Sequence, residues 1–260
     1  MAGRPHPDWL RPEWAATGVG ALMTTRRGGV SEGAFESLNL KPGLGDADSA
    51  VAENQARLAA AIGAVPVWLE QVHGRDVVRL SAGQGGACAD ASLTTEPGVA
   101  CVVQVADCLP ALFAAPGARG VAAAHAGWRG LAAGVLEATL AALCEAAGCA
   151  PQQVQVWLGA CIGPGEFEVG ADVLRAFGAD ELAACGAEAP AAPPRFVPRR
   201  EGKWLADLPG LARDRLRAAG VHAVSGGRWC TVADRSRFFS FRRDGRTGRM
   251  AAAIWLEPRG

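Results

Sequence analysis

Short apolar segments that end at Gly, Pro or Asp recur through the middle of the chain and limit its possible folds more than any other feature. The clearest of them are VVRL at 77–80, ACVVQV at 100–105, ALFAA at 111–115 and VAAAHA at 121–126. These segments are too short for typical helices, and they are apolar at nearly every position, as strands are when both faces of their sheet are covered. A buried β-sheet is therefore expected.

Segments with other patterns surround these strands. Apolar runs beside turn residues predict further strands at 19–25, 67–73, 154–161, 238–241 and 250–256. Helical spacing, with capping residues or a final Gly, predicts helices at 48–61, 129–147, 171–177 and 207–219. Because strands and helices are mixed without regular βαβ alternation, the pattern indicates an α/β fold.

The length of the chain bounds the number of domains. Its 260 residues are half apolar, which is enough for one large domain or two small ones. The sequence contains no internal repeat and no linker that would divide it, and the Pro- and Ala-rich segment at 185–204 is interpreted as a surface excursion. We therefore expect a single α/β domain over residues 1–260, with residues 1–18 as an N-terminal extension.

The charge balance favours a small-molecule partner. Lys and Arg number 26, as do Asp and Glu, so no strong overall field would attract nucleic acid or an anionic membrane. The first residues lack the apolar run of a secretory signal, and no uninterrupted apolar stretch of about 18 residues, the length of a membrane helix, is present. A cytoplasmic protein is expected.

Eight cysteines are scattered through the chain without the dense spacing of a disulfide framework. We expect most of them to be free thiols. Four of these cysteines have apolar or helical surroundings and are interpreted as small buried hydrophobic residues: Cys101, Cys144, Cys149 and Cys230.

His73, Cys108 and His125 are the candidate metal ligands. All three lie at the ends of expected strands beside Gly, Asp or Pro, where side chains from different strands can converge at one edge of a sheet. Two imidazoles and one thiolate suit Zn²⁺, and three protein ligands leave a position open for water or substrate. Their spacing alone is not a recognised zinc signature, so two polar loop histidines and a buried thiol are the alternative interpretation. His6 and His222 have no context that suggests a ligand.

Arginines near these residues are candidates for binding an anion. The Gly-rich loop after the first strand contains Arg26, Arg27 and Asn39, and a guanidinium beside a glycine pair can bind phosphate. The same loop can equally be a turn with solvated charges. Arg129 lies at the start of an expected helix just beyond His125, where the helix N-terminus also attracts anions.

Six motifs, taken in order, resemble the YfiH family, which has long been labelled as laccase-domain or polyphenol oxidase proteins. They are MTTRRGGVSEGAFESLNL, EQVHG, VADCLP, HAGWRG, GACIGP with FEVG, and FRRDGRTGR. The resemblance extends from about Leu22 to Leu256. After CIGP the family pattern often has a second cysteine and a tyrosine, where this chain has Gly165 and Phe167. That departure puts a thiol or phenol role at those two positions in doubt.

The resemblance implies a layered α/β/β/α sandwich with mixed sheets and a purine nucleoside phosphorylase activity. It implies adenosine, inosine, guanosine and methylthioadenosine as substrates with phosphate, an added adenosine deaminase activity, and zinc bound by His73, Cys108 and His125. We expect these ligands and Arg129 to be catalytic. Substrate-binding residues are expected to be Arg26, Asn39 and Arg243.

For deamination, a proton donor for the departing ammonia is required, and Asp107 and Glu70 are candidates because they are near the ligands in the sequence. For phosphorolysis, the arginines would position phosphate beside C1′ of the ribose. The active form is expected to be a monomer or a homodimer.

Three other functions remain open at this stage. A copper-dependent polyphenol oxidase matches the older family label, and copper would bind a His/Cys site in vitro, but a multicopper site usually needs more than the four histidines present. A cysteine hydrolase would use Cys108 as nucleophile with His125 as base and His73 as partner, on an amide such as a peptidoglycan precursor. A zinc-stabilised binding protein would use the same ligands without catalysis.

Overall fold

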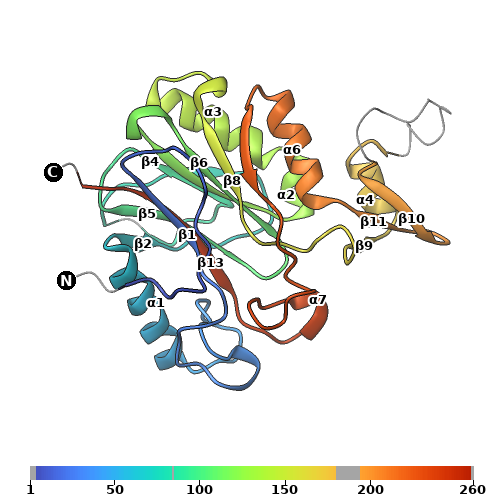
Figure 1. Ribbon diagram of the computed structural model, residues 1–260, viewed down its shortest axis with the longest axis horizontal. Coiled ribbons are helices and arrows are strands. Elements are labelled where there is room, and N and C mark those ends of the chain that lie inside the picture. Colours follow the sequence, from blue (N-terminus) through green and yellow to red (C-terminus); the bar gives the residue numbers. More distant parts are fainter. Residues whose placement is uncertain (1–3, 84, 180–193, 259–260) are drawn as a thin grey trace.

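The apolar strands expected from the sequence are buried because two β-sheets stack face to face and helices cover both outer sides (Figure 1). A computed structural model of the chain describes residues 4–83, 85–179 and 194–258. In this part of the chain, one hydrophobic cluster lies between the two sheets, and one lies between each sheet and its helices. The layered α/β/β/α sandwich with mixed sheets is therefore confirmed.

The smaller stacked sheet combines strands from both ends of the chain. In spatial order its strands are β1 (Val19–Met23), β13 (Met250–Leu256), β5 (Val99–Val105) and β2 (Val65–Val67). β13 is antiparallel to both of its neighbours, β1 and β5, whereas β2 is parallel to β5. Every residue of β5 is buried, which explains why its sequence is continuously apolar instead of alternating.

The larger stacked sheet is also mixed. In spatial order its strands are β12 (Ala223–Gly226), β8 (Gln155–Leu158), β6 (Leu109–Ala114), β7 (Val121–Ala126), β4 (Ala91–Thr94) and β3 (Val77–Arg79). The two outermost pairs, β12 with β8 and β3 with β4, are parallel, and the central pairs are antiparallel.

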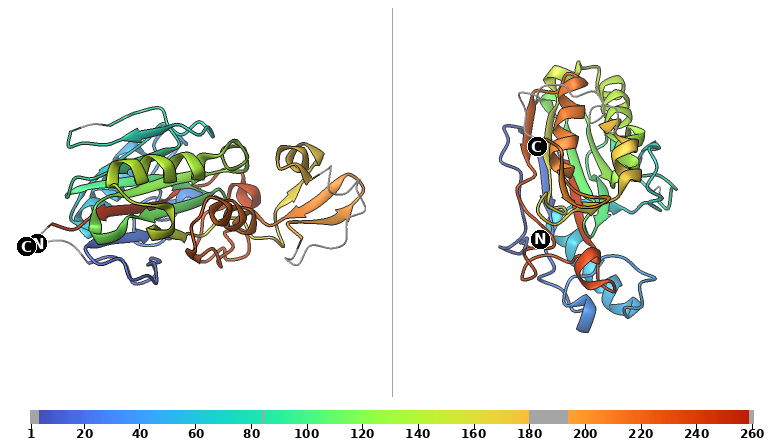
Figure 2. Two further views of the ribbon diagram at one scale, coloured as in Figure 1. Left: turned by 90° about the horizontal axis from the view of Figure 1, so that it is seen from above. Right: turned by 90° about the vertical axis from the view of Figure 1, so that its right-hand side faces the viewer.

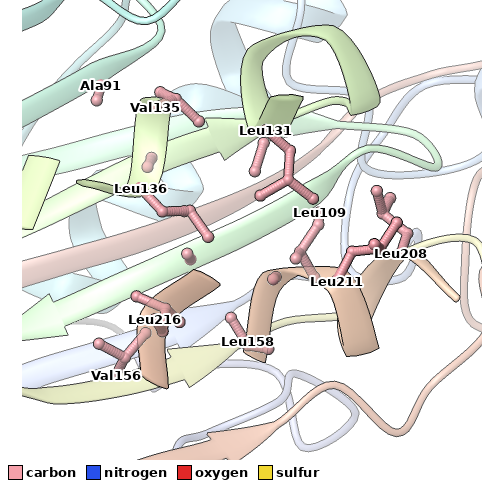
Figure 3. Packing of buried hydrophobic residues seen from close by; sticks show 14 of the residues in the cluster. Ala91, Leu109, Leu131, Val135, Leu136, Val156, Leu158, Leu208, Leu211 and Leu216 are labelled. Carbon is pink, nitrogen blue, oxygen red and sulfur yellow. The ribbon is translucent and has the colours of Figure 1, made fainter. Parts of the chain in front are cut away.

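Helices cover the outer face of each sheet. Helix α1 (Asp48–Ile62) packs on the smaller sheet through Leu58 and Ile62. Helices α3 (Val135–Ala147) and α6 (Leu208–Ala218) pack on the larger sheet. Figure 3 shows leucines of these helices against the strand residues Leu109, Val156 and Leu158. None of the helices in the described ranges is long and apolar enough to span a membrane.

The remaining elements are short. They are the helices α2 (Trp128–Ala133), α4 (Ala171–Ala176) and α7 (Phe241–Asp244), and 3₁₀ turns at Gly33–Phe35, Pro116–Ala118 and Pro151–Gln153. A third sheet consists of β10 (Phe196–Arg200), β11 (Lys203–Ala206) and β9 (Glu168–Val169). This sheet projects from one end of the sandwich (Figure 2). The surface excursion expected at 185–204 includes β10, while its residues 185–193 lie outside the described part.

Three expected elements differ from the structure. The helix predicted at 129–147 is two helices, α2 and α3, because Gly134 between them adopts a left-handed φ of 94°. The strand predicted at 238–241 is absent, since Phe238 and Phe239 are buried without strand pairing and Ser240 caps α7 by accepting a hydrogen bond from the Arg243 N–H. The strand predicted at 67–73 ends at Val67.

Alternation along β7 directs one candidate ligand into the space between the sheets. Ala122 and Ala124 belong to the cluster under α3 and α6, whereas Ala123 belongs to the cluster between the two sheets. Because successive side chains of a strand point to opposite faces, His125 lies on the same face as Ala123. The fold therefore places this imidazole at the end of the space between the sheets.

Candidate metal centre and its cavity

His73, Cys108 and His125 come together in the folded chain. Their potential ligand atoms all lie within 4.8 Å of one another, and Cys108 Sγ is 3.9 Å from His73 Nε2. The two imidazole rings are edge to face, with centroids 4.8 Å apart. His125 is buried, Cys108 is half-buried and His73 is exposed. Two nitrogen donors and one sulfur donor in this arrangement could hold a transition-metal ion.

Each of the three residues is positioned by a strand end or the loop beside it. His125 is near the end of β7, Cys108 directly precedes β6, and β6 pairs with β7 along its length. His73 comes from the loop between β2 and β3 and adopts a left-handed φ of 61°. Rigid strands thus fix two donors, and the third depends on a loop whose backbone must be held in an unfavourable conformation.

Asp90 holds that loop and one imidazole at the same time. Its carboxylate accepts hydrogen bonds from the backbone N–H groups of Val72, His73 and Gly74, at 3.1, 3.0 and 2.6 Å. It also accepts a 2.7 Å hydrogen bond from His125 Nδ1, which fixes the proton of the ring on that atom. His125 Nε2 is then the ring atom left to bind a metal, as is usual for histidine ligands with a carboxylate partner.

The electrostatics of the group favour the ionised thiol. Burial alone would raise the pKa of Cys108, but attraction to His125 and hydrogen bonds with His125 and His73 outweigh it and bring this pKa to about 6. Burial would lower the pKa of His125, whereas Cys108 and Asp90 raise it to about 9. The thiolate is the form of cysteine that binds metals and that attacks as a nucleophile.

Asp107 is a second strained residue beside the ligands. Its φ of 93° makes it one of three non-glycine residues with positive φ in the described ranges, together with His73 and Ala118. Its carboxylate accepts hydrogen bonds from the Thr231 hydroxyl at 2.6 Å and from the Arg242 backbone N–H at 2.7 Å. Conformations of this kind cost about 1–3 kcal/mol per residue, and here one of them is at the candidate ligand His73 and another directly precedes the candidate ligand Cys108.

Two glycines of the HAGWRG motif permit this close packing. A Cβ atom at Gly127 would lie 2.9 Å from His73 Cδ2 and 3.1 Å from Cys108 Sγ. A Cβ atom at Gly130 would lie 2.7 Å from the carbonyl oxygen of Gly74. The motif therefore combines one candidate ligand with the space that the other two require.

The three side chains line a cavity of about 320 Å³. Its wall also contains two cations, two amides and an aromatic ring, and these residues are Lys41, Arg249, Gln71, Gln104 and Phe241. Neither cation forms an ion pair with a carboxylate of the described residues.

Burial lowers the pKa of both Lys41 and Arg249, and repulsion from Arg249 lowers that of Lys41 further. Cations that are partly desolvated and close to one another are stabilised by an anion between them. The cavity therefore combines a group that could bind a metal with a site suited to an anion.

Asn39, expected to bind substrate, organises this cationic pair instead of lining the cavity. It is fully buried, and its Oδ1 accepts hydrogen bonds from the backbone N–H groups of Lys41 at 3.2 Å and Arg249 at 2.9 Å. Its Nδ2 donates to Asp46 at 2.9 Å and to the Lys41 carbonyl at 3.1 Å. Asn39 thus connects the first Gly-rich loop with the segment before β13.

The structure does not bring the three predicted arginines into this cavity. Arg26 lies in a separate cavity and donates hydrogen bonds to the carbonyls of Glu36 and Arg235. Arg129 is exposed, and its guanidinium stacks on the neighbouring ring of Trp128 at 4.3 Å.

Arg243 is engaged within the protein. Its guanidinium donates hydrogen bonds to the carbonyls of Thr231, Val232 and Phe238, and it forms an ion pair with Asp244 at 2.6 Å. Arg243 therefore stabilises the chain around α7, and most of its guanidinium N–H groups already have acceptors within the protein.

Sequence reasoning missed Asp90, Lys41, Arg249 and Phe241. Weak signals existed, since Arg249 and Phe241 are the two ends of the FRRDGRTGR motif and Lys41 follows the first motif directly. An acidic residue that immediately precedes a fully buried strand, as Asp90 precedes β4, also indicates an internal partner.

The expectation of free thiols is confirmed for the cysteines that the structure describes. Of the four interpreted as buried, Cys101 is fully buried and the other three are half-buried. Cys185 lies outside the described residues.

Comparison with known sequences identifies the family. The sequence model described as "Multi-copper polyphenol oxidoreductase laccase" matches residues 20–257. The chain belongs to this family. A purine nucleoside phosphorylase of Pseudomonas aeruginosa is 49% identical over 250 residues, which are 96% of this chain and 98% of the relative. The purine nucleoside phosphorylase YfiH of Escherichia coli is 47% identical over 254 residues, which are 96% and 97% of the two chains.

Solved structures of the family have the same fold. A Neisseria meningitidis protein superposes with a TM-score of 0.87 at 44% identity, over 96% of this chain and 100% of that one. YlmD from Geobacillus stearothermophilus also superposes with a TM-score of 0.87, at 33% identity over 98% of both chains. The resemblance to YfiH proteins drawn from the motifs is confirmed.

Proposed function

We propose that the chain is a zinc-dependent purine nucleoside phosphorylase that also deaminates adenosine. The observation that carries this proposal is one cavity that contains both a His–Cys–His group and two cations that form no ion pair within the described residues. The proposed substrates are adenosine, inosine, guanosine and methylthioadenosine, with inorganic phosphate as the second substrate. The names of relatives at 49% and 47% identity support a reaction of this kind.

The donor set fits zinc. Imidazole and thiolate are common zinc ligands, and three protein ligands are typical of catalytic sites, which keep one position for water or substrate. His73, Cys108 and His125 would hold the ion, with Asp90 fixing the tautomer of His125. A zinc ion there would supply Lewis-acid polarisation at its open position.

Copper is the alternative metal, because divalent copper binds nitrogen and sulfur donors more tightly than zinc does. An oxidase with several copper ions would need several groups of ligands. Within the described ranges, His73, Cys108 and His125 form the one group of three or more His, Cys, Asp or Glu side chains placed to share an ion. Metal analysis of protein produced without added copper separates the two metals.

Lys41 and Arg249 would bind phosphate for phosphorolysis. In this reaction a phosphate oxygen forms a bond to C1′ of the ribose while the bond from C1′ to the purine nitrogen breaks. The electron pair of the broken bond leaves with the purine, which takes up a proton. Two fixed cations orient the phosphate for attack, and charge-assisted hydrogen bonds of this kind are stronger than neutral ones.

Deamination needs a proton carrier in the protein. A water oxygen bonds to C6 of the adenine ring and the amino group leaves as ammonia, so a proton must reach the leaving nitrogen. Both carboxylate oxygens of Asp107 are engaged in short hydrogen bonds. Glu70 is exposed and close enough to raise the pKa of Lys41, so it is the better carrier of the two predicted acids.

A cysteine hydrolase is the second candidate function. In such an enzyme Cys108 would be the nucleophile and His125 the base. Asp90 would orient that base through the 2.7 Å hydrogen bond from His125 Nδ1. Such an enzyme needs no metal, and chelation would leave its rate unchanged. A zinc enzyme would lose its activity under the same treatment.

Incubation of the zinc-loaded protein with adenosine tests the proposal. With phosphate we expect adenine and ribose 1-phosphate, and without phosphate we expect inosine and ammonia. A chelator should abolish both reactions, and added zinc should restore them. If adenosine, inosine and methylthioadenosine all stay unchanged over hours, the proposal is contradicted.

A further inference from the structure

Phe241 is an aromatic side chain that the fold leaves unpacked in the wall of the cavity. It is 59% exposed, and the other large hydrophobic side chains left exposed in the described part of the chain are valines. Aromatic rings contribute strongly to stability when buried. Single exposed hydrophobic residues are common on surfaces, but an exposed ring in the wall of a cavity that also holds polar groups indicates a surface for a ligand.

The backbone beside Phe241 is bonded to the segment that carries one candidate metal ligand. Phe241 begins α7, and the next residue, Arg242, donates its backbone N–H to Asp107, which directly precedes Cys108. The guanidinium carbon of Arg249 lies 5.7 Å from the centre of the ring. The backbone at the start of α7 is thus tied to the residue before Cys108, and the Phe241 ring lies beside one of the two cations, as the residues of a preorganised site do.

The other parts of the cavity wall do not offer a comparable surface. Gln71 exchanges two hydrogen bonds with the backbone of Gln104, and the Gln104 amide donates to the Leu40 carbonyl at 2.7 Å. In the described residues, Phe241 is the aromatic side chain of this wall apart from the two imidazoles. A purine base is flat and aromatic, and it stacks well on such a ring.

We propose that the purine base of the nucleoside stacks on Phe241, while Lys41 and Arg249 hold phosphate. This inference rests on the proposed function. It separates the cavity into an aromatic side for the base and a cationic side for the anion, with the candidate metal ligands in the same wall.

Inosine binding to the zinc-loaded full-length chain in phosphate-free buffer tests the inference, because neither phosphorolysis nor deamination proceeds there. Calorimetry should show that Phe241→Ala weakens inosine binding by about tenfold or more, as expected for loss of a stacked base. Phe241→Trp should keep the affinity within about threefold, since it retains an aromatic face. Val197→Ala removes an exposed hydrophobic side chain outside the cavity and should leave the affinity unchanged.

Kinetics supply the second readout. In Phe241→Ala the KM for inosine should rise by a similar factor, while the KM for phosphate stays within about twofold.

If Phe241→Ala binds inosine as tightly as the unaltered chain, the stacking role is contradicted and the proposed function stands. If the same variant changes only the oligomeric state, the ring belongs to a contact between copies. If the unaltered chain neither binds nor converts any purine nucleoside, the proposed function fails, and the stacking role fails with it.

Discussion

The cavity beside the His–Cys–His group and the cavity beside the TRRGG loop both have cations in their walls, and they differ in the carboxylates that those cations contact. In the smaller one, of about 320 Å³, Lys41 and Arg249 lie beside the His–Cys–His group and form no ion pair within the described residues. In the larger one, of about 570 Å³, Arg27 pairs with Asp8 at 3.4 Å, and Arg235 pairs with Asp244 at 3.2 Å.

The difference shows that a run of arginines does not by itself make an anion site. In the larger cavity the arginines of the TRRGG loop already have partners within the protein. Arg27 pairs with the Asp8 carboxylate, and Arg26 donates a 2.8 Å hydrogen bond to the backbone carbonyl of Glu36. In the smaller cavity, Arg249 also donates to two backbone carbonyls, those of Thr247 and Gly248, but burial lowers the pKa of both cations and neither forms an ion pair within the described residues. The smaller cavity is therefore the one whose cations lack a carboxylate partner that phosphate would have to displace.

Loss of the thiol should have the largest effect. Cys108→Ala removes one of three donors, so we expect zinc content to fall far below one ion per chain. Nucleoside cleavage should fall by more than about 100-fold, the upper end of what loss of an outer hydrogen-bond partner costs a metal site. Metal analysis and initial rates measure both effects. Cys88→Ala, at an exposed thiol outside the group, is the matched control, and equal losses in the two variants would contradict a role for Cys108.

The comparison of the two cavities predicts opposite results for cations of the same charge. Lys41→Ala or Arg249→Ala should raise the KM for phosphate by about 10- to 100-fold, which corresponds to the loss of one charge-assisted hydrogen bond. Arg27→Ala should change it by less than about twofold, as is usual for an exposed ion pair. Phosphate titrations at fixed inosine measure these values. A larger rise in Arg27→Ala than in Lys41→Ala would reverse the assignment of the cavities.

Asp90→Asn tests how the metal group is held together. The amide cannot accept the hydrogen bonds from Val72, His73, Gly74 and His125 as the carboxylate does, so the left-handed His73 loop and the His125 ring lose a shared partner. We expect zinc affinity to fall by about 10- to 100-fold. Competition with a chromogenic chelator measures the affinity. An unchanged value would show that the ligands are positioned without Asp90, and Asp172→Asn serves as a control at an exposed carboxylate.

Gly127→Ala should have the smallest effect of the series. Its Cβ would press on His73 and Cys108 from 2.9 and 3.1 Å, so the ligands must move apart. Strain from overpacking is typically about 1–3 kcal/mol, and near the lower end of that range zinc affinity falls by about tenfold. Gly165→Ala, where a Cβ would meet nothing within 4 Å, should bind zinc as the unaltered chain does. The same chelator competition compares the two variants, and equal affinities would contradict the packing argument.

The layers of the fold follow from local sequence because burial on both faces leaves a direct mark on the strands. β5, β6 and β7 are apolar throughout, and they were predicted within a few residues of their observed bounds. Phe238 and Phe239 show where this reasoning fails, since two buried rings suggest a strand although their burial comes from packing between the sheets without strand pairing. The N-cap at Ser240 was the local signal against it.

The candidate metal group was predictable for a similar reason, since His125 and Cys108 border strands that the sequence does reveal. The cationic pair was not predictable, because tertiary contacts create it. Asn39 joins Lys41, its near neighbour, to Arg249, which lies 210 positions beyond Asn39 in the sequence. Likewise, no local pattern distinguishes Arg243, enclosed by carbonyl groups, from a free guanidinium.

Release of hypoxanthine from inosine tests most directly whether the His–Cys–His group and the unpaired cations act in one reaction. The measurement compares protein with and without zinc, each with and without phosphate. Release is expected only when zinc and phosphate are both present, together with one ribose 1-phosphate for each hypoxanthine. Hypoxanthine that forms at the same rate without phosphate, or after complete removal of the metal, would contradict a shared site.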